Sequence, residues 1–243
     1  MQHRVGQARG IWLALLLAAG VQLAARAGAP VTVSVIEHGR VLEQISRDVL
    51  SEAYRRIDTP LVFKEVPALR ALAESVEGQV DGELHRMDGL ARRYPSLVQV
   101  KVPINWFEVV VLTRSARFVP QGWDSLRPYS VGVHRGILAI EQGTRGMRID
   151  PAPSNDLVLR KLMAGRTDVA VMPDIEAREL LLARQDSGVK ILAPALARVP
   201  LYHYLHKRNR MLAQRLEGVL KAMEADGTIA AIRSRLLARA GLP

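Results

Sequence analysis

The stretch ALAESVEGQVDG, residues 71–82, is followed 87 positions later by a similar stretch, LVLRKLMAGRTDVAV, residues 157–171. In both stretches an apolar helical stripe leads to a glycine, Gly78 or Gly165, and three residues later to an aspartate, Asp81 or Asp168. Each pattern predicts a helix that ends at a glycine in the left-handed conformation, followed by a turn into a strand. Two such units in series indicate an α/β protein with two lobes, and two-lobed proteins usually bind a molecule between the lobes.

The first residues have the pattern of a secretory signal peptide, to which we assign residues 1–27. A basic start is followed by an apolar run from Ile11 to Ala25, and small residues then mark a cleavage site after Ala27. A cut after Ala29 also fits the small residues, but Pro30 would follow it. An uncleaved anchor is the alternative, although the run is shorter than the ~20 apolar residues that a membrane span requires. We therefore expect a periplasmic protein.

The chain contains no cysteine. A lipid-modified N-terminal cysteine, disulfides and thiolate metal sites are thereby excluded, and nothing in the sequence indicates another metal or a cofactor. About half of the residues (49%) are apolar, which is enough to build a sizeable core in two small lobes. We expect a monomer held together by that core.

The formal charge of the chain is +10, and it falls to +7 once Arg4, Arg9 and Arg26 leave with the signal peptide. A basic surface can serve nucleic acid, an anionic membrane or an acidic ligand. Export argues against nucleic acid as a partner. The basic residues are also scattered over the expected helices, which favours an ordinary soluble, arginine-rich surface.

Alternating strand and helix patterns after the signal peptide predict two α/β sheets. The expected strands are 31–36, 61–66, 97–104, 107–112, 129–133, 168–172, 189–192 and 199–205, with a loop-and-helix stretch between Asp81 and Arg93. The run FEVVVLT, residues 107–113, is apolar on both faces and predicts a central strand. We place lobe 1 at residues 28–112 with 203–243 returning to it, and lobe 2 at 113–202, with a crossing at each end of lobe 2.

Charged residues follow several of these strands, where ligands of open α/β sheets bind. They are Glu37 and His38 after the first strand, Arg86 with Glu83 and His85 after Asp81, Arg135 after the strand VGV, and Asp174 after VAVM. Arg86 is the strongest candidate, because a guanidinium grips a carboxylate through two parallel hydrogen bonds. Asp174 fits the N-cap of the following helix equally well.

No catalytic motif stands out: the nucleophile elbow, the phosphate-binding loop and the His-Glu-x-x-His motif are all missing from the sequence. His203 and His206 have a spacing that suggests a metal site. Their flanking pattern is that of a strand, however, where residues three apart point to opposite faces. We therefore predict that this pair binds no metal.

From Val31 to the C-terminus the chain resembles the periplasmic solute-binding proteins of ABC importers, of the family-3 or amino-acid type. The resemblance rests on LAESVEGQVDG, SLRPYSVGVHRG, LMAGRTDVAVMPD and the closing YLHKRNRMLAQRLEGVLKAMEADGTIAAI. It implies the type II fold, with two α/β lobes joined by two hinge strands that close on a small molecule.

The resemblance also implies roles for individual residues. Arg93 falls by spacing near the arginine that holds the α-carboxylate of amino-acid ligands, and Arg86 falls among the residues of the cleft wall. Asp174 matches the aspartate that receives the α-ammonium group. The family's hydroxyl-bearing Gly-Ser/Thr-Thr is replaced by residues 136–138, Gly-Ile-Leu, and Glu37-His38 stands where an aromatic clamp is usual. The ligand therefore stays open, with a polar or anionic small molecule favoured.

The sequence thus predicts an exported, non-enzymatic binding protein that serves an ABC permease. Two alternatives remain. One is an enzyme on the same scaffold, similar to exported cyclohexadienyl or arogenate dehydratases, for which Glu37 would be the early candidate acid. The other is a sensory binding module that works without a transporter.

Overall fold

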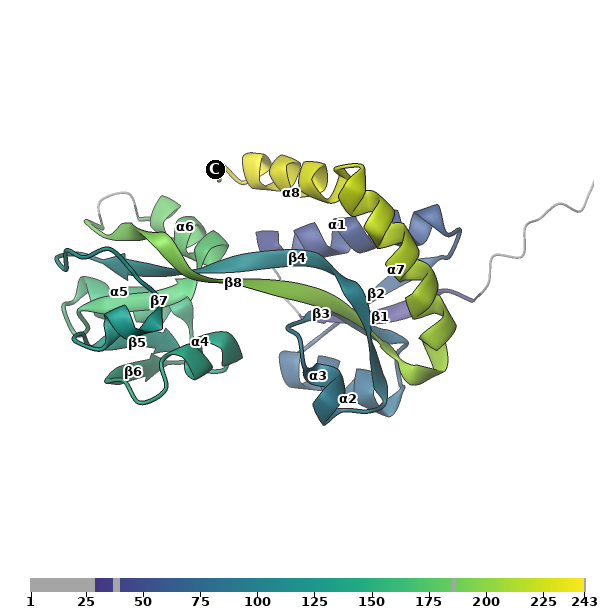
Figure 1. The fold of residues 1–243 in the computed structure, drawn as a ribbon, viewed down its shortest axis with the longest axis horizontal. Helices are drawn as coiled ribbons and strands as arrows, with labels where there is room; N and C mark the ends of the chain where they lie inside the picture. The colour runs from purple at the N-terminus through teal and green to yellow at the C-terminus, as the bar shows by residue number, and fades with distance from the viewer. Residues whose placement is uncertain (1–28, 37–39, 185–186, 243) are drawn as a thin grey trace, which may run out of the picture.

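The computed structural model describes residues 29–36, 40–184 and 187–242. The chain forms two lobes that lie side by side and are joined by two long strands, as Figure 1 shows. The predicted signal peptide, Glu37 and His38 lie outside the described residues.

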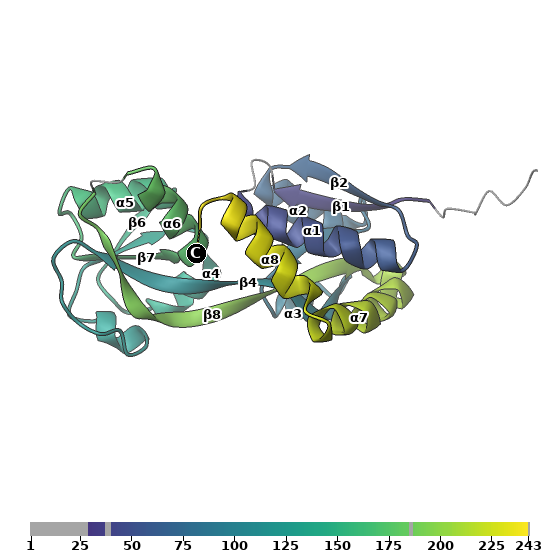
Figure 2. The same cartoon turned by 90° about the horizontal axis from the view of Figure 1, so that it is seen from above.

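Lobe 1 is built from the first half of the chain and from its C-terminal end. Its elements are β1 (Val31–Ile36), α1 (Val41–Arg56), β2 (Leu61–Val66), α2 (Ala68–Glu77), β3 (Gly82–Arg86), α3 (Leu90–Arg93), α7 (Arg210–Ala225) and α8 (Thr228–Arg239). Strands β2, β1 and β3 pair in parallel, because the helices α1 and α2 return the chain to the same edge of the sheet. Figure 2 shows α8 lying across α1 on one face of this lobe.

Lobe 2 repeats the same construction in the middle of the chain. Its elements are the 3₁₀ turn η1 (Trp123–Leu126), β5 (Val131–His134), α4 (Leu138–Gly143), β6 (Ile149–Ala152), α5 (Asn155–Met163), β7 (Val169–Pro173) and α6 (Asp174–Leu182). Strand β5 pairs in parallel with β6 on one side and with β7 on the other.

Two 17-residue strands, β4 (Leu97–Thr113) and β8 (Lys190–His206), run antiparallel through both lobes. We call them the hinge strands. They join the two lobe sheets into one, with the strand order β2-β1-β3-β8-β4-β7-β5-β6. The expected central position of residues 107–113 is confirmed, because this part of β4 is hydrogen-bonded to β7 and β8.

The repeated phrase has the predicted structure in both lobes. Helix α2 ends at Gly78 with φ +73°, and α5 is followed by Gly165 with φ +70°, a region in which a side chain is strained. Asp81 accepts a hydrogen bond from the Thr32 backbone N–H in β1 (2.9 Å). Asp168 accepts one from the Ser130 N–H at the start of β5 (2.7 Å). Both aspartates therefore fix the turn that leads into the next strand.

The apolar core is divided between the lobes. One cluster fills lobe 1 around α1, α7 and α8, and β4 contributes to it as far as Ile104. From Phe107 onward, the buried side chains of β4 join the clusters of lobe 2. The core thus changes between Ile104 and Phe107, upstream of the lobe boundary expected at Thr113, and that boundary stays a prediction.

Several predicted elements were wrong in detail. The strand that the repeated phrase predicts after Asp81 is present as β3, residues 82–86, so the loop-and-helix stretch expected between Asp81 and Arg93 begins only after Arg86. Glu83 can be buried in this strand because Arg86 is hydrogen-bonded to its carboxylate. The strand pairs 97–104 with 107–112, and 189–192 with 199–205, are each one continuous strand. The edge strand β6 was not predicted, because IDPA is short, largely polar at its start and contains a proline.

Within the described residues, none of the helices combines the length and apolar character that a bilayer crossing requires.

Candidate functional site

The strand ends on which ligands of open α/β sheets bind meet at the junction of the lobes. In lobe 1, β1 leads into α1, and in lobe 2, β7 leads into α6. The start of α1 lies against α6: the guanidinium of Arg40, the residue before α1, lies 3.9 Å from the carboxylate of Glu179 in the second turn of α6, and Ile175 of α6 is buried in the core cluster of lobe 1. The ends of β1 and β7 are therefore neighbours, and we take this junction as the candidate site.

Arg86 lies at the end of β3 with its guanidinium engaged by Glu83. Its Nε and Nη2 both donate to Glu83 Oε1, at 2.8 and 2.5 Å. Glu83 is only 2% exposed, and its second oxygen, Oε2, is buried without a hydrogen-bond partner among the described residues. Burial raises the pKa of Glu83, while the positive charge of Arg86 and its hydrogen bonds lower it. The first-lobe cation is thus held in place by a carboxylate of the chain itself.

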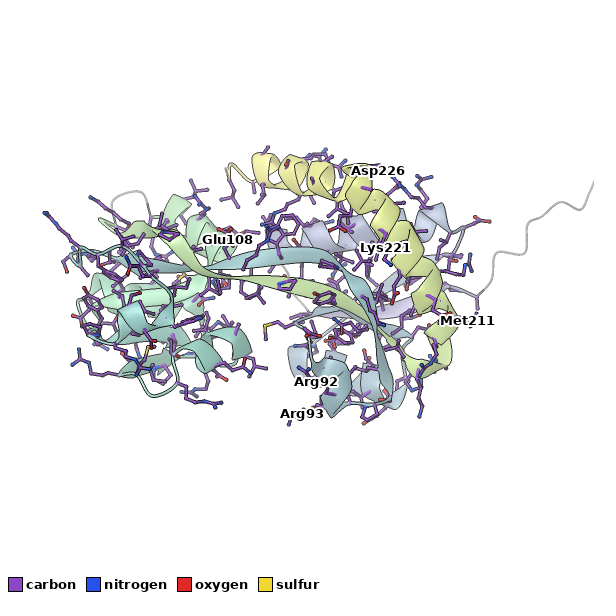
Figure 3. All side chains as sticks on the ribbon, viewed as in Figure 1. Arg92, Arg93, Glu108, Met211, Lys221 and Asp226 are labelled. Atoms are coloured by element: carbon purple, nitrogen blue, oxygen red, sulfur yellow. The ribbon has the colours of Figure 1, made fainter. Side chains whose placement is uncertain are left out.

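Asp174 is the first residue of α6, at the end of β7. Its Oδ1 accepts a hydrogen bond from the Glu108 backbone N–H in the hinge strand β4 (2.8 Å). Figure 3 shows Glu108 on the hinge strands between the lobes. The N-cap interpretation is not supported, because Pro173 occupies that position and Asp174 bonds to β4 instead of its own helix. Asp174 therefore links the start of α6 to the hinge strand β4.

Arg135 and Arg93 are both exposed. Arg135 follows β5, and its backbone N–H donates to Ala152 in β6 (2.9 Å). Arg93 ends the short helix α3 and places its guanidinium 5.6 Å from the ring centre of Tyr94. In Figure 3, Arg93 lies with Arg92 on the underside of lobe 1, at the end of the helix that leads into β4. Its contact with a ligand stays a prediction.

The backbone N–H just before helix α4 already binds a carboxylate of the chain. The Gly136 N–H donates to Glu141 Oε1 (2.7 Å), so the Glu141 side chain stands where the resemblance implies the carboxylate of a ligand. Glu141 is the fourth residue of α4 (Leu138–Gly143) and was not among the predicted site residues, although its spacing from Gly136 is that of a local cap.

Sequence reasoning also missed a buried polar network beneath the junction. Asn105 lies in β4 between Ile104 and Phe107, where the core changes from lobe 1 to lobe 2, and we call residues 104–107 the crossing segment. The Asn105 amide donates to Leu42 O (2.9 Å) and Ser46 Oγ (3.0 Å) of α1. Its Oδ1 accepts from Arg233 Nη1 of α8 (2.6 Å). Both Asn105 and Arg233 are buried, at 0% and 8% exposure. The network connects lobe 1 helices to the hinge strand where the core changes from one lobe to the other.

The network continues toward the junction through His85, whose Nδ1 lies 2.7 Å from Ser46 Oγ and whose Nε2 lies 3.8 Å from Glu43. Burial lowers the pKa of His85 to about 3, with smaller contributions from Arg86 and His203, so the ring is neutral at neutral pH. Burial raises the pKa of Glu43, and the negative charge of Glu176 in α6 raises it further. Carboxylates from the two lobes therefore act on each other across the junction.

His203 and His206 do not share a site. His203 is buried, with Nδ1 bonded to Glu83 O (2.8 Å) and Nε2 3.1 Å from the Tyr54 hydroxyl. His206 lies beside Gly78 and Arg208 at the end of β8. No group of three or more potential metal ligands occurs within the described ranges.

No family model matches the chain. An uncharacterized protein of Shewanella oneidensis is 27% identical over 186 residues, which is 74% of this chain and 70% of that protein.

Solved structures resemble the chain over most of its length. The GluR0 ligand-binding core in complex with L-glutamate has a TM-score of 0.71 at 13% identity, covering 87% of this chain and 99% of that chain. A histidine kinase sensor domain with similarity to periplasmic binding proteins has a TM-score of 0.69 at 17% identity, covering 87% and 97%. An ancestral arginine-binding protein bound to arginine has a TM-score of 0.66 at 15% identity, covering 86% and 99%. The chain has the two-lobed type II periplasmic-binding-protein fold.

Proposed function

We propose that this protein is an exported solute-binding protein that captures a small polar or amino-acid-like molecule between its lobes. The observation that carries the proposal is the junction itself, where strand ends from both lobes meet and carry charged side chains from α1, β3 and α6. The neighbouring structures with L-glutamate and arginine support a ligand of this class for the fold. In this proposal, residues 28–112 with 203–243 and residues 113–202 are the two halves that close.

Arg86 and Asp174 are the central ligand contacts in this proposal, one from each lobe. A ligand carboxylate would compete with Glu83 for the Arg86 guanidinium, and a ligand ammonium would add to Asp174, whose Oδ1 already accepts from Glu108. Glu37, His38, Arg93 and Arg135 would line the remaining walls. Binding contacts made by both lobes at once favour the closed arrangement and shift the population toward it.

The closed form would be the signal that a second protein reads. An inner-membrane ABC permease is the partner we favour, because the resemblance in sequence is to the binding proteins of importers. A sensor is the alternative partner. The fold is as similar to a histidine kinase sensor domain as it is to transport-type binding proteins, so the fold alone favours neither partner. A pull-down of the inner-membrane partner with the ligand-saturated protein distinguishes the two.

A thermal-shift screen against amino acids, organic acids and small peptides tests the proposal. A ligand at ~100 times its Kd stabilises the folded protein by about 2.7 kcal/mol. For a protein of about this size, each kcal/mol raises Tm by about 2–4 °C, so a hit should shift Tm by at least about 5 °C. The proposal fails if no compound of these classes shifts Tm.

Two substitutions of Asp174 separate its ligand contact from its structural bond. Asp174→Asn keeps an oxygen for the Glu108 N–H but removes the negative charge, so it should weaken a cationic or zwitterionic ligand while leaving Tm nearly unchanged. Asp174→Ala removes both and should lower Tm as well. If Asp174→Asn binds the hit as tightly as wild type, Asp174 is a hinge residue only.

An enzyme on the same fold is the second candidate, because two carboxyl groups near the junction, Glu43 and Glu83, have their pKa raised by burial. A raised pKa is what a general acid needs near neutral pH. Incubation with prephenate and arogenate tests this candidate. Turnover that disappears in Glu83→Gln would replace the binding-protein proposal with the enzymatic one.

A further inference from the structure

A pocket of about 310 Å³ lies on the hinge strands, apart from the candidate site. It is lined by Pro103 and Trp106 of β4, Arg198 and Pro200 of β8, Glu224 of α7, and Ile229 and Ala230 of α8. Its lining is mainly apolar, with a few polar groups, and its volume is at the lower end of the range for small-molecule sites, roughly 300–1,000 Å³. None of its residues belongs to the set that we place in the interlobe site.

Two guanidinium groups lie against Trp106, and they differ in how they are engaged. Arg233 is 4.3 Å from the ring centre and also donates to Asn105 Oδ1 (2.6 Å) and Trp106 O (2.9 Å), so its donors serve the fold. Arg198 is exposed, 4.1 Å from the ring centre. Within the described part of the chain, no carboxylate lies within 4.0 Å of the Arg198 guanidinium. This includes the carboxylate of Glu108, which is opposite Arg198 in the register of β4 and β8.

Among the described residues, Arg198 therefore presents a positive charge that has no ion-pair partner and lies against the Trp106 ring. A cation–π contact favours this position, and a planar guanidinium recognises a carboxylate with two parallel hydrogen bonds. The two prolines and Ile229 provide apolar surface beside it. Glu224, on the same lining, opposes a second negative charge on any occupant.

We infer that this hinge pocket is a second ligand site, specific for a small monocarboxylate with an apolar body. The carboxylate pairs with Arg198, and the apolar body packs on Trp106 and the prolines. Because hinge strands form one wall and α7 and α8 form the other, the occupant bridges the crossing segment and lobe 1.

The experiment uses phenylacetate as the probe and Trp106 fluorescence as the readout. The chain has three tryptophans, and Trp12 lies in the predicted signal peptide, so in the mature protein Trp123→Phe leaves Trp106 as the only indole. In this background, phenylacetate should change the emission with a Kd of about 1 mM or tighter. Arg198→Gln should weaken that Kd at least about tenfold, because it removes a charge-assisted pair.

Matched controls separate this site from general charge effects. Arg210→Gln removes an exposed positive charge at the start of α7, outside the pocket, and should leave the Kd unchanged. The neutral analogue 2-phenylethanol should bind at least about tenfold more weakly than phenylacetate. The dianion phenylsuccinate should also bind more weakly, and Glu224→Gln should remove that difference.

Arg198→Lys keeps the charge and loses the planar fork, so an intermediate Kd is expected even if Arg198→Gln folds poorly. The inference is overturned if phenylacetate leaves Trp106 emission unchanged up to about ten times the expected Kd. It is equally overturned if Arg198→Gln and Arg198→Lys both bind phenylacetate like the parent, or if Arg210→Gln weakens binding as much as Arg198→Gln does.

Discussion

Replacing Asn105 by alanine should destabilise this protein more than replacement of any exposed polar residue. The side chain is fully buried at the point where the core passes from one lobe to the other, and its amide makes three hydrogen bonds to other elements. The bond from Arg233 is charge-assisted and contributes ~1.5–3 kcal/mol, and the two donated bonds contribute ~0.5–1.5 kcal/mol each.

The expected loss for Asn105→Ala is about 3–5 kcal/mol, within the range for a broken buried network. Arg233 keeps its bond to Trp106 O and Ser46 keeps its contact with His85, which holds the loss below the upper sum. Denaturant unfolding should show a lower midpoint with an unchanged m-value. Thermal unfolding should show a Tm lower by about 6–20 °C for a protein of this size.

Asn209→Ala is the matched control, because Asn209 also donates two hydrogen bonds, both to Asp81, from a partly exposed position. Asp81 keeps its bonds from Thr32 and Arg208, so the control should cost only about 1 kcal/mol. A loss for Asn105→Ala equal to that of Asn209→Ala would refute the idea that the network at Asn105 holds the crossing segment.

Two further predictions follow from buried and strained positions. Burial lowers the pKa of His203 to about 4 from 6.5, so below pH 6.5 the unfolded chain binds a proton that the folded chain does not. The stabilisation lost in His203→Gln should therefore be largest at pH 7 and should shrink as the pH falls toward 4, as measured by denaturant unfolding; a constant loss across this range would contradict it. Gly165→Ala should cost ~1–2 kcal/mol for the left-handed backbone alone, since no atom of the described residues lies within 4 Å of the added Cβ. Gly78→Ala should cost more, because the added Cβ would meet the side chains of His206 and Arg208 at 3.2 and 3.3 Å; equal costs would show that these contacts relax freely.

The sequence predicted helices, strands and turns correctly where apolar residues recur with a regular helical or strand spacing. The repeated phrase placed Gly78 and Gly165 correctly as helix ends and the two aspartates as turn residues. The phrase did not give the extent of β3, since Glu83 and Arg86 look like loop residues until each is known to neutralise the other.

The candidate site was less predictable than the fold, because the partners of its residues are far apart in sequence. Asp174 was singled out correctly as a residue at a strand end, but its bond to the Glu108 amide spans 66 positions. The Asn105 network joins β4 to α1 and α8, and a single asparagine within an apolar strand gives no sign of such partners.

The central claim is that a small solute binds between the lobes and closes them. Small-angle X-ray scattering of the protein, with and without the compound identified by thermal shift, tests it most directly. The account predicts that a saturating ligand reduces the radius of gyration of the wild-type protein and leaves that of Asp174→Ala unchanged. A ligand that stabilises the protein while the radius of gyration stays the same in both would contradict the account.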